Sequence, residues 1–187
     1  MSKRALLVAF LFVSLPSWAE LDLDKLSKIA PSAQELSGSF VQQKYLADLD
    51  AQIISSGRFN YQHGQSIHWE TLQPIQNVLL MTPHSISNSQ NGREIMSLQA
   101  DTNPVVELLS TIFFSVLTAD WKNLAQHFEL NGSLSANRWS IQLTPKDQNL
   151  SQIIKQVNLE GTALLQEAIF FEQNGDRTTI TFSELTR

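Results

Sequence analysis

Apolar and polar residues alternate along most of the chain from Ser39 onward, which is the period of a β-strand with one buried and one solvated face. Short segments containing Gly, Pro or Asn interrupt the alternation, so the strands are short and their connections are tight. About ten such strands are expected to form a curled, mostly antiparallel sheet with helices on its concave side, which is an α+β fold. The predicted strands cover residues 39–46, 53–62, 67–72, 77–82, 85–90, 93–99, 128–134 and 139–143, followed by a C-terminal hairpin.

The loop His63-Gly64-Gln65 determines which side chains of the flanking strands share a face. A three-residue loop pairs Phe59 with Trp69 and Tyr61 with Ile67, which places all four on one face. A two-residue loop would place them on opposite faces, because a slip of one residue turns a strand over. The apolar pattern therefore favours the three-residue loop.

Two Asn-Gly dipeptides predict further hairpins. Asn91-Gly92 joins residues 85–90 to residues 93–99. A two-residue turn at Asn174-Gly175 joins the last two strands and gives them one mostly apolar face. The cross-strand pairs expected from this turn are Phe171 with Thr178, Ile169 with Ile180, and Glu167 with Phe182.

The helical segments are few. Residues 21–36 have helical spacing, with a break at Pro31 and a stop at Ser37-Gly38. Asn103-Pro104 opens a helix that runs to Thr118 and is apolar over about half of its circumference, wider than the usual stripe of a surface helix. A short helix over residues 121–127 and a helical turn over residues 150–155 complete the prediction.

The first residues are predicted to be a signal peptide. Lys3 and Arg4 precede an apolar stretch that is shorter than the roughly 20 residues of a membrane span, and Ser17-Trp18-Ala19 ends it with small residues at the positions a signal peptidase reads. We expect cleavage after Ala19, with residues 1–19 as signal peptide and residues 20–187 as one domain. An uncleaved anchor is the alternative.

Composition excludes several classes of function. The chain has no cysteine, which rules out disulfides and thiolate metal sites. Its net charge of −5 becomes more negative once Lys3 and Arg4 are removed, which argues against nucleic acid as a partner and against steady residence on an anionic membrane.

No pattern of residues predicts catalysis or a cofactor. The histidines, His63, His68, His84 and His127, have no metal-binding spacing, and no serine lies in a nucleophile-elbow or phosphate-loop motif. The glutamates are scattered along strands without a pair suited to acid–base chemistry. We therefore expect no enzyme, no metal and no cofactor.

Aromatic residues at inward positions are the remaining candidate site. Six of them face the broad helix from different strands: Phe59, Tyr61, Trp69, Trp139, Phe171 and Phe182. A filled core is one interpretation of this set, and a ligand cavity is the other.

The strand region resembles the periplasmic outer-membrane lipoprotein carriers of the LolA/LolB family, over roughly Leu21 to Phe182. The resemblance is carried by the order and spacing of several short motifs. They are Phe40-x-Gln42, Ser56-Gly57-x-Phe59, Trp69-x-Thr71-x-x-Pro74, Val78-Leu79-Leu80, Trp139 with Leu143-x-Pro145, and the final hairpin. The segment Asn174–Ile180 is similar to a LolA-like branch associated with biosynthetic clusters for lipids and aryl polyenes.

The resemblance implies an incomplete, half-open β-barrel of ten or eleven strands with a helical lid, and lipid acyl chains held between them. The cavity residues it implies are Phe40, Phe59, Tyr61, Ile67, Trp69, Leu80, Ile112, Phe113, Leu117, Trp139, Ile141, Phe171 and Phe182, with Val105, Leu109 and Val116 on the lid. His63-Gly64 stands where the family's best-known carriers have an arginine that latches the lid.

The implied function is a monomeric periplasmic carrier that shuttles a lipid or lipoprotein from the inner to the outer membrane, with transient contacts to an inner-membrane exporter and an outer-membrane acceptor. The alternative is a sensor or interaction domain that binds lipid or protein ends without transport. The carrier hypothesis expects unfilled, water-free space beneath the helix over residues 104–118.

Overall fold

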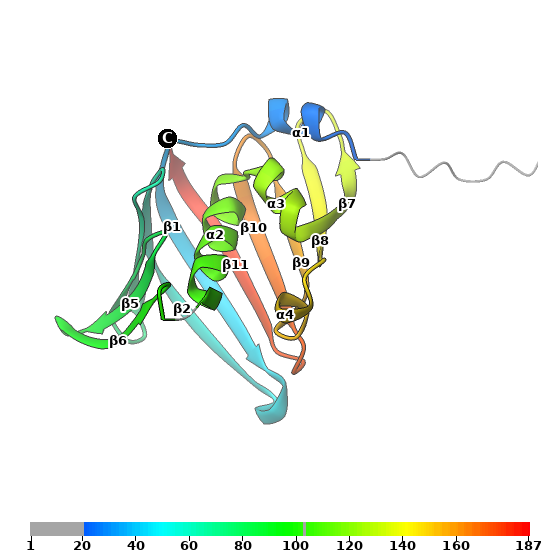
Figure 1. The fold of residues 1–187 in the computed structure, drawn as a ribbon. Coiled ribbons are helices and arrows are strands. Elements are labelled where there is room, and N and C mark those ends of the chain that lie inside the picture. The colour runs from blue at the N-terminus through cyan, green and yellow to red at the C-terminus, as the bar shows by residue number, and fades with distance from the viewer. Residues whose placement is uncertain (1–20, 103) are drawn as a thin grey trace, which may run out of the picture.

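The computed structural model describes residues 21–102 and 104–187, which form one 11-stranded sheet and a set of helices (Figure 1). The strands are β1 (Glu35–Leu46), β2 (Ala51–Gln62), β3 (Ser66–Gln73), β4 (Asn77–Met81), β5 (Ser85–Gln90), β6 (Arg93–Gln99), β7 (Phe128–Leu134), β8 (Trp139–Pro145), β9 (Ile154–Gly161), β10 (Leu165–Glu172) and β11 (Arg177–Thr186). The helices are α1 (Leu23–Ile29), α2 (Pro104–Thr118), α3 (Trp121–His127) and α4 (Gln148–Ser151), with a 3₁₀ turn, η1, at Ala47–Leu49.

The sheet consists of two antiparallel meanders, β1–β6 and β7–β11, which join where the first and last strands pair. In the strand order β6-β5-β4-β3-β2-β1-β11-β10-β9-β8-β7, the edge strands β6 and β7 lie at opposite ends, so the barrel is open. The predicted α+β fold, an unclosed antiparallel barrel with helices, is confirmed.

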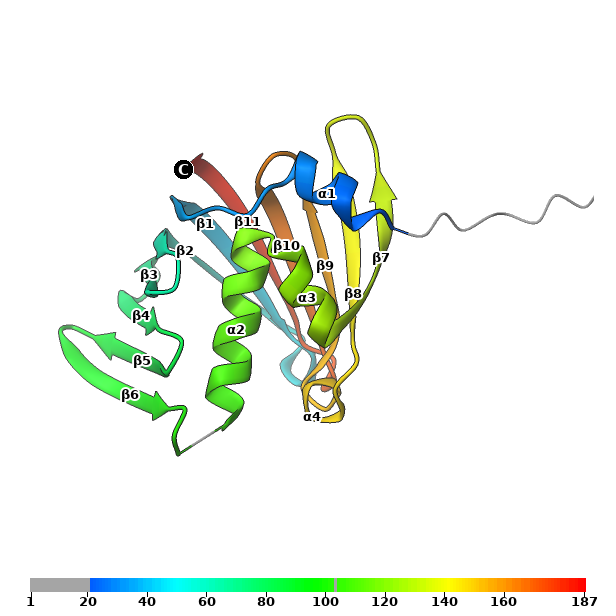
Figure 2. The same cartoon turned by 45° about the horizontal axis from the view of Figure 1, so that its top comes forward.

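Helix α2 lies inside the curve of the sheet, with β3–β6 on one side and β9–β11 on the other (Figure 2). The short helices begin at aspartates whose side chains accept backbone N–H bonds: Asp22 caps α1, Asp120 caps α3 and Asp147 caps α4. The bounds predicted for α2 and α3 are confirmed. Two predicted features, the signal peptide over residues 1–19 and the cap at Asn103, lie outside the described residues.

The N-terminal helix is shorter than the sequence predicts. It ends at Ile29, and β1 already begins at Glu35. Pro31 cannot continue a helix because it lacks a backbone N–H. Beyond Pro31, Leu36 pairs with Tyr61 across β1 and β2. The Leu36 side chain is buried there, so this segment is stabilised as a strand and not as a continuation of the helix.

Strand β9 was not among the predicted strands. The predicted helical turn over residues 150–155 ends early, with α4 finishing at Ser151, and β9 begins at Ile154. The buried residues Ile154, Val157 and Leu159 do not alternate strictly along this segment, which hides its strand character in the sequence.

Two of the three predicted hairpins are confirmed in register. Phe59 pairs with Trp69 and Tyr61 with Ile67 around the three-residue loop 63–65. At the second hairpin Gln90 pairs with Arg93, and both Asn91 and Gly92 have positive φ angles of 52° and 72°, as a two-residue hairpin turn of this kind requires.

The register predicted for the C-terminal hairpin is wrong by one residue. Ala168 pairs with Ile180 and Phe170 with Thr178, because the loop contains three residues, with Gly175 at a φ of 91°. The backbone N–H of Glu172 donates to the Asp176 carbonyl oxygen at 2.9 Å and closes this loop. The shift turns Phe170, instead of Phe171, toward the interior.

Candidate functional site

Four aromatic side chains meet on the concave face where the two meanders join: Phe40, Phe59, Trp69 and Phe182. The rings of Phe40 and Trp69 stack with centroids 3.9 Å apart, and Phe59 stacks on Trp69 at 5.7 Å. Phe182 meets Phe59 and Trp69 edge-on at 5.6 and 6.2 Å. We call these four residues the aromatic cluster. All four were predicted to line the interior, and all four are buried.

Gly57 gives the ring of Phe40 its place in this cluster. The two residues are cross-strand partners on β1 and β2. A Cβ atom on residue 57 would lie 2.9 Å from the Phe40 ring and would collide with the carbonyl oxygen of Glu70. The glycine of the Ser56-Gly57-x-Phe59 motif is therefore required first by the close approach of the β3 backbone at Glu70 and then by the ring of Phe40.

Helix α2 covers the aromatic cluster. The ring of Phe113 stands edge-on to Trp69 at 6.0 Å, and Phe114 stands edge-on to Tyr61 at 5.7 Å. Ile112, Val116 and Leu117 are buried, whereas Leu109 and Phe113 are half-buried. The side chain of Val105, the remaining predicted lid residue, lies outside the described part of the chain.

A narrow apolar cleft, which we call the α2 cleft, runs between α2 and the last two strands. It is lined by Phe113, Val116, Leu117, Ala168, Phe170, Ile180 and Phe182, and its cavity volume is about 10 Å³. Pockets for drug-sized ligands span roughly 300–1,000 Å³. The expectation of unfilled space beneath this helix is therefore wrong for this conformation: side chains fill most of it.

Two predicted cavity residues do not point into the interior. Leu80 pairs with His68 on the convex face and is 37 % exposed, while its neighbour Met81 is buried opposite Ile67. Phe171 faces outward opposite Arg177 because of the register shift at the last hairpin. In both places the sequence is a continuous apolar run, so alternation does not identify the inward residue.

Three other predicted residues are buried outside the α2 cleft. Trp139 packs edge-on against Trp121 of α3 at 4.9 Å, and Ile141 is buried on the same strand, β8. Ile67 is buried beside Tyr61 on the other side of α2. Sequence reasoning missed Ala168 and Phe170 as cleft residues, and a three-residue loop at 173–175 would have identified them. Ile180 was predicted to lie on the apolar face of the hairpin but was not among the predicted cavity residues.

The opposite side of α2 faces a larger and more polar groove. It is lined by Tyr61, His63, Gly64, Pro83, Thr111, Phe114, Ser115, Thr118, Asp120 and Asn123, with an empty volume of about 540 Å³ including space open to solvent. We call it the polar groove. It contains His63 and Gly64, the pair predicted to stand where relatives have a latch arginine.

The polar side chains of α2 bond mostly within their own helix. The Ser115 hydroxyl donates to the Thr111 carbonyl oxygen at 2.7 Å, and the Thr118 hydroxyl donates to the Phe114 carbonyl oxygen at 2.8 Å. The amide of Asn123 on α3 donates to the Ser115 hydroxyl oxygen at 2.9 Å. A rigid movement of α2 would keep the first two bonds.

Tyr61 connects the aromatic side of the interior to the polar groove. Its hydroxyl lies 2.9 Å from Nδ1 of His63. Burial raises the pKa of the Tyr61 phenol, a hydrogen bond with the Thr118 hydroxyl lowers it, and the negative charge of Asp120 raises it. The phenol therefore stays neutral at physiological pH and acts as a hydrogen-bonding group.

Residues 21–102 and 104–187 contain no group of three or more His, Asp or Glu residues placed to hold a metal ion. In the same residues, no helix has both the length and the apolar character needed to cross a membrane.

Comparison with known proteins places the chain in a family. The model of the family "outer membrane lipoprotein carrier protein LolA" matches residues 31–187. A search of curated proteins finds no match. The narrower resemblance to the branch associated with biosynthetic clusters stays a prediction.

Several solved structures are similar to this chain at low sequence identity. The LolA superfamily protein NE2245 from Nitrosomonas europaea has 10 % identity and a TM-score of 0.44, with 88 % of this chain and 90 % of that chain covered. A putative outer membrane lipoprotein-sorting protein domain from Vibrio parahaemolyticus has 8 % identity and a TM-score of 0.42. The match covers 88 % of this chain and 89 % of that domain. The MucA/MucB complex of Pseudomonas aeruginosa contains a chain with 14 % identity and a TM-score of 0.42, but 87 % of this chain covers only 56 % of that one.

Since the family model matches most of the chain, and the open antiparallel sheet with its helices agrees with the predicted fold, the chain belongs to the LolA family of outer membrane lipoprotein carrier proteins.

Proposed function

We propose that this protein is a periplasmic carrier that takes up the acyl chains of a lipid or lipoprotein between α2 and the sheet and shuttles them from the inner to the outer membrane. The observation that carries this proposal is the position of α2. Its apolar side closes the α2 cleft over the aromatic cluster, while its other side borders the polar groove. Membership of the LolA family supports the same role.

The energetic demand on such a carrier is large. Each buried CH₂ group contributes about 0.8 kcal/mol, so a 16-carbon chain exposed to water costs roughly 12 kcal/mol. The free energy of an acyl chain in the interior must therefore be close to its free energy in the bilayer. A site that binds the chain much more weakly could not extract it, and a site that binds it much more strongly could not release it. The apolar residues that line the α2 cleft provide a dry surface of this kind.

Loading requires α2 to move, because the α2 cleft is too small for an acyl chain in this conformation. The polar groove supplies space on the opposite side of the helix. When α2 moves away from β10 and β11 toward this groove, the hydrogen bonds of Ser115 and Thr118 to their own helix are kept. Cargo then stabilises the open state, and release restores the closed one.

The remaining parts of the proposal concern processing and partners. The chain is exported, the signal peptide is removed after Ala19, and residues 20–187 act as one monomeric domain. The carrier makes transient contacts with an inner-membrane exporter and an outer-membrane acceptor, and it carries out no catalysis.

The test combines cargo analysis with a transfer assay. Protein purified from its native periplasm without detergent is extracted, and the lipids are identified by mass spectrometry; transfer of a labelled acylated peptide between donor and acceptor vesicles is then followed. The substitution Phe113→Asp places a charge in the α2 cleft and is expected to abolish lipid recovery and transfer. Leu80→Asp, on the convex face, is the matched control and is expected to retain both.

Two results would contradict the carrier role. Wild-type protein that carries no lipid and transfers none has no carrier function. Wild-type protein that binds lipid tightly, gives no net transfer and holds a stable protein partner is a sensor or interaction domain. Circular dichroism of both variants establishes that any loss of binding is not caused by unfolding.

A further inference from the structure

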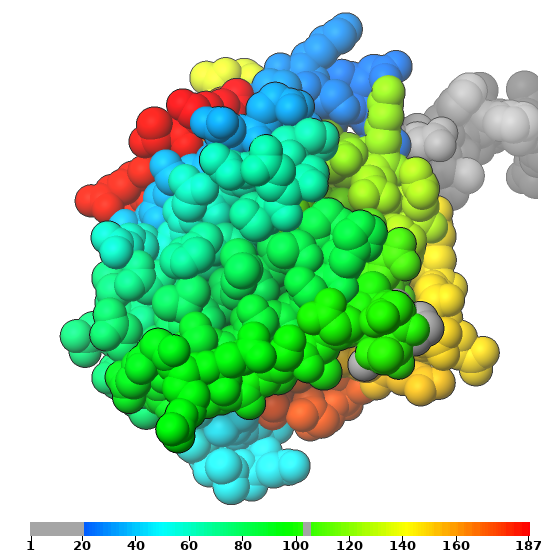
Figure 3. Space-filling view, turned by 60° about the vertical axis from the view of Figure 1, so that its left-hand side comes forward, coloured from blue at the N-terminus to red at the C-terminus, as the bar shows by residue number. Residues whose placement is uncertain are grey.

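The hairpin of β1 and β2 is longer than the strand that flanks it. β2 pairs with β1 along its entire length, from Gln62 opposite Glu35 to Ala51 opposite Leu46. β3 pairs with β2 only from Ser56 onward, where Ser56 lies opposite Gln73. Within the described part of the chain, residues 51–55 therefore have a strand neighbour on one side only. We call this segment the free β2 edge, and Figures 1 and 3 show the cyan tip of its hairpin projecting beyond the rest of the sheet.

The free β2 edge carries two large apolar side chains in contact with solvent. Ile53 is 50 % exposed and Ile54 is 56 % exposed, and as consecutive strand residues they point to opposite faces of the sheet. Leu72 and Ile75, where β3 ends and the chain turns to β4, are exposed as well. Unpaired backbone groups flanked by exposed apolar side chains form a template for another strand.

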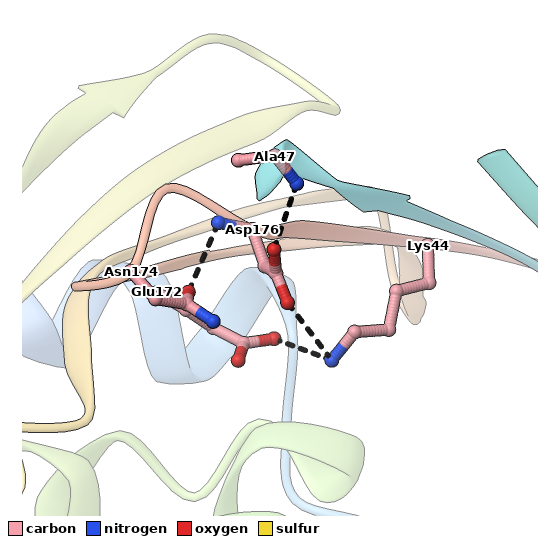
Figure 4. A network of polar contacts seen from close by, with 5 residues as sticks. All are labelled: Lys44, Ala47, Glu172, Asn174 and Asp176. Carbon is pink, nitrogen blue, oxygen red and sulfur yellow. Dashed lines mark hydrogen bonds and ion pairs between the residues drawn. The ribbon is translucent and has the colours of Figure 1, made fainter. Parts of the chain in front are cut away.

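The hairpin is fixed in place, so this edge is formed before any partner arrives. Figure 4 shows the network that ties it to the turn between β10 and β11. The Lys44 ammonium lies 3.0 Å from the Glu172 carboxylate and 3.8 Å from that of Asp176. The Ala47 backbone N–H donates to the Asp176 carboxylate at 2.9 Å. Preorganisation of this kind lowers the entropic cost of binding.

The charge of the hairpin tip is negative. Asp48 lies within η1 and Asp50 ends it, and no ion pair of either carboxylate is found among the described residues. Two cations lie nearby: Lys44, which is already matched by Glu172 and Asp176, and Arg177, which pairs with Tyr45 on the β11 side of the hairpin, away from the free β2 edge. The whole chain carries a net charge of −5, so the tip favours a basic partner and disfavours an anionic membrane surface.

We propose that the free β2 edge binds an extended, basic segment of a partner protein, which adds to the sheet as a strand beside residues 51–55. Main-chain hydrogen bonds supply the affinity, and alternate side chains of the segment cover Ile53 or Ile54 while its Lys and Arg side chains approach Asp48 and Asp50. This surface lies outside the α2 cleft, so the inference does not depend on the carrier function.

The other exposed edge strand of the same meander is less suitable. β6 is exposed along its length, but its pairing with β5 is interrupted by a register shift between Asn88 and Ser89. A bulge of this kind twists an edge and blunts its ability to pair. β6 also begins with Arg93 and Glu94, which carry charges of opposite sign. Their charges therefore give β6 no preference for a basic partner segment over an acidic one.

The experiment uses a short, capped peptide of alternating valine and lysine as the probe. Hydrogen exchange of the full mature chain is followed by NMR with and without the peptide. We expect slower exchange at those amides of residues 51–55 that point away from β1. The same peptide with N-methylated backbone amides, which cannot form strand hydrogen bonds, is expected to bind weakly, and so is a peptide of alternating valine and glutamate.

Two matched variants locate the site. Ile54→Lys removes apolar contact and adds repulsion, and it is expected to weaken peptide binding about tenfold or more. Ile153→Lys changes an isoleucine of similar exposure, 46 %, that precedes β9, and it is expected to change affinity less than about twofold. Protection at residues 93–99 in place of 51–55, equal binding of the N-methylated peptide, or equal affinity of the two variants would overturn the proposal.

Discussion

The interior of this protein has two regions that differ in how firmly they are closed. One region, which we call the sealed end, lies under α1 and α3, where side chains of these helices and of β7–β9 are almost completely buried. Its members are Leu26, Trp121, Leu124, Phe128, Trp139, Leu143, Val157 and Leu159. The other region is the α2 cleft, where Phe113 of the covering helix is only half-buried and a narrow, partly solvent-open space separates α2 from β10 and β11.

The two regions also differ in how side-chain hydrogen bonds connect their helices to the rest of the fold. At the sealed end the indole N–H of Trp121 donates to the Ala30 carbonyl oxygen at 3.1 Å, which ties α3 to the end of α1. The hydroxyls of Ser115 and Thr118 on α2 donate to carbonyl oxygens of their own helix, and the Asn123 amide of α3 links α2 to α3 through the Ser115 hydroxyl. We infer that the sealed end holds the fold together and that α2, which is tied to α3 near its own C-terminal end, is the element that moves in the proposed carrier cycle.

The largest predicted effect is on the sealed end. Leu159→Ala removes a fully buried side chain and is expected to lower the free energy of unfolding by about 3 kcal/mol, measured by urea denaturation. Binding of an acyl probe at temperatures where the variant is folded should be unchanged. A loss below about 1 kcal/mol would show that the sealed end is no more firmly packed than the rest.

A smaller effect is expected from Phe113→Ala on α2. Its half-buried ring contacts Trp69 edge-on, so its loss should lower the free energy of unfolding by about 1.5 kcal/mol. Amide hydrogen exchange of α2 should become about tenfold faster, while exchange of β9 stays slow. Equal acceleration in both elements would mean that α2 does not open separately from the sealed end.

The smallest effect concerns Asp176, which joins two hairpins of the sheet far from α2. The backbone N–H of Ala47 holds the pKa of this carboxyl below its usual range, with help from Asn174 and Lys44 despite partial desolvation. A lowered folded-state pKa stabilises the fold above the unfolded value of about pH 4, and this contribution is lost as the pH falls through the folded value.

Asp176→Asn should therefore make the acid-unfolding curve less steep below about pH 4 and leave acyl-probe binding at neutral pH unchanged. Circular dichroism across an acid titration measures the first effect. An altered probe affinity at neutral pH would show that the hairpin network is coupled to the α2 cleft.

Much of the fold follows from local patterns in the sequence. Alternation located most strands, and the apolar residues on both sides of the loop 63–65 allow only one register, which the pairing of Phe59 with Trp69 confirms. The wide apolar face of residues 104–118 and the proline at its start predicted α2 and its role as a cover.

The errors have a common physical origin. The run Ile169-Phe170-Phe171 and the run Val78-Leu79-Leu80 are apolar without alternation, so a face can be assigned only when the turn is known. The Asn-Gly dipeptide at 174–175 favours a two-residue turn, but the loop takes three residues. The size of the α2 cleft depends on how side chains of α2, β10 and β11 interdigitate, and periodicity carries no information about that packing.

The most direct test of the account holds α2 against the sheet. The chain has no cysteine, so Val116→Cys with Ala168→Cys introduces a unique pair of thiols across the α2 cleft. The pair is joined with a short, cleavable bifunctional thiol reagent, and each single variant carrying a monofunctional analogue controls for the volume of the reagent. We predict that the cross-linked protein does not bind an acyl probe and that cleavage restores binding to the level of the single-variant controls; equal binding before and after cleavage would contradict the claim that acyl chains enter beneath α2.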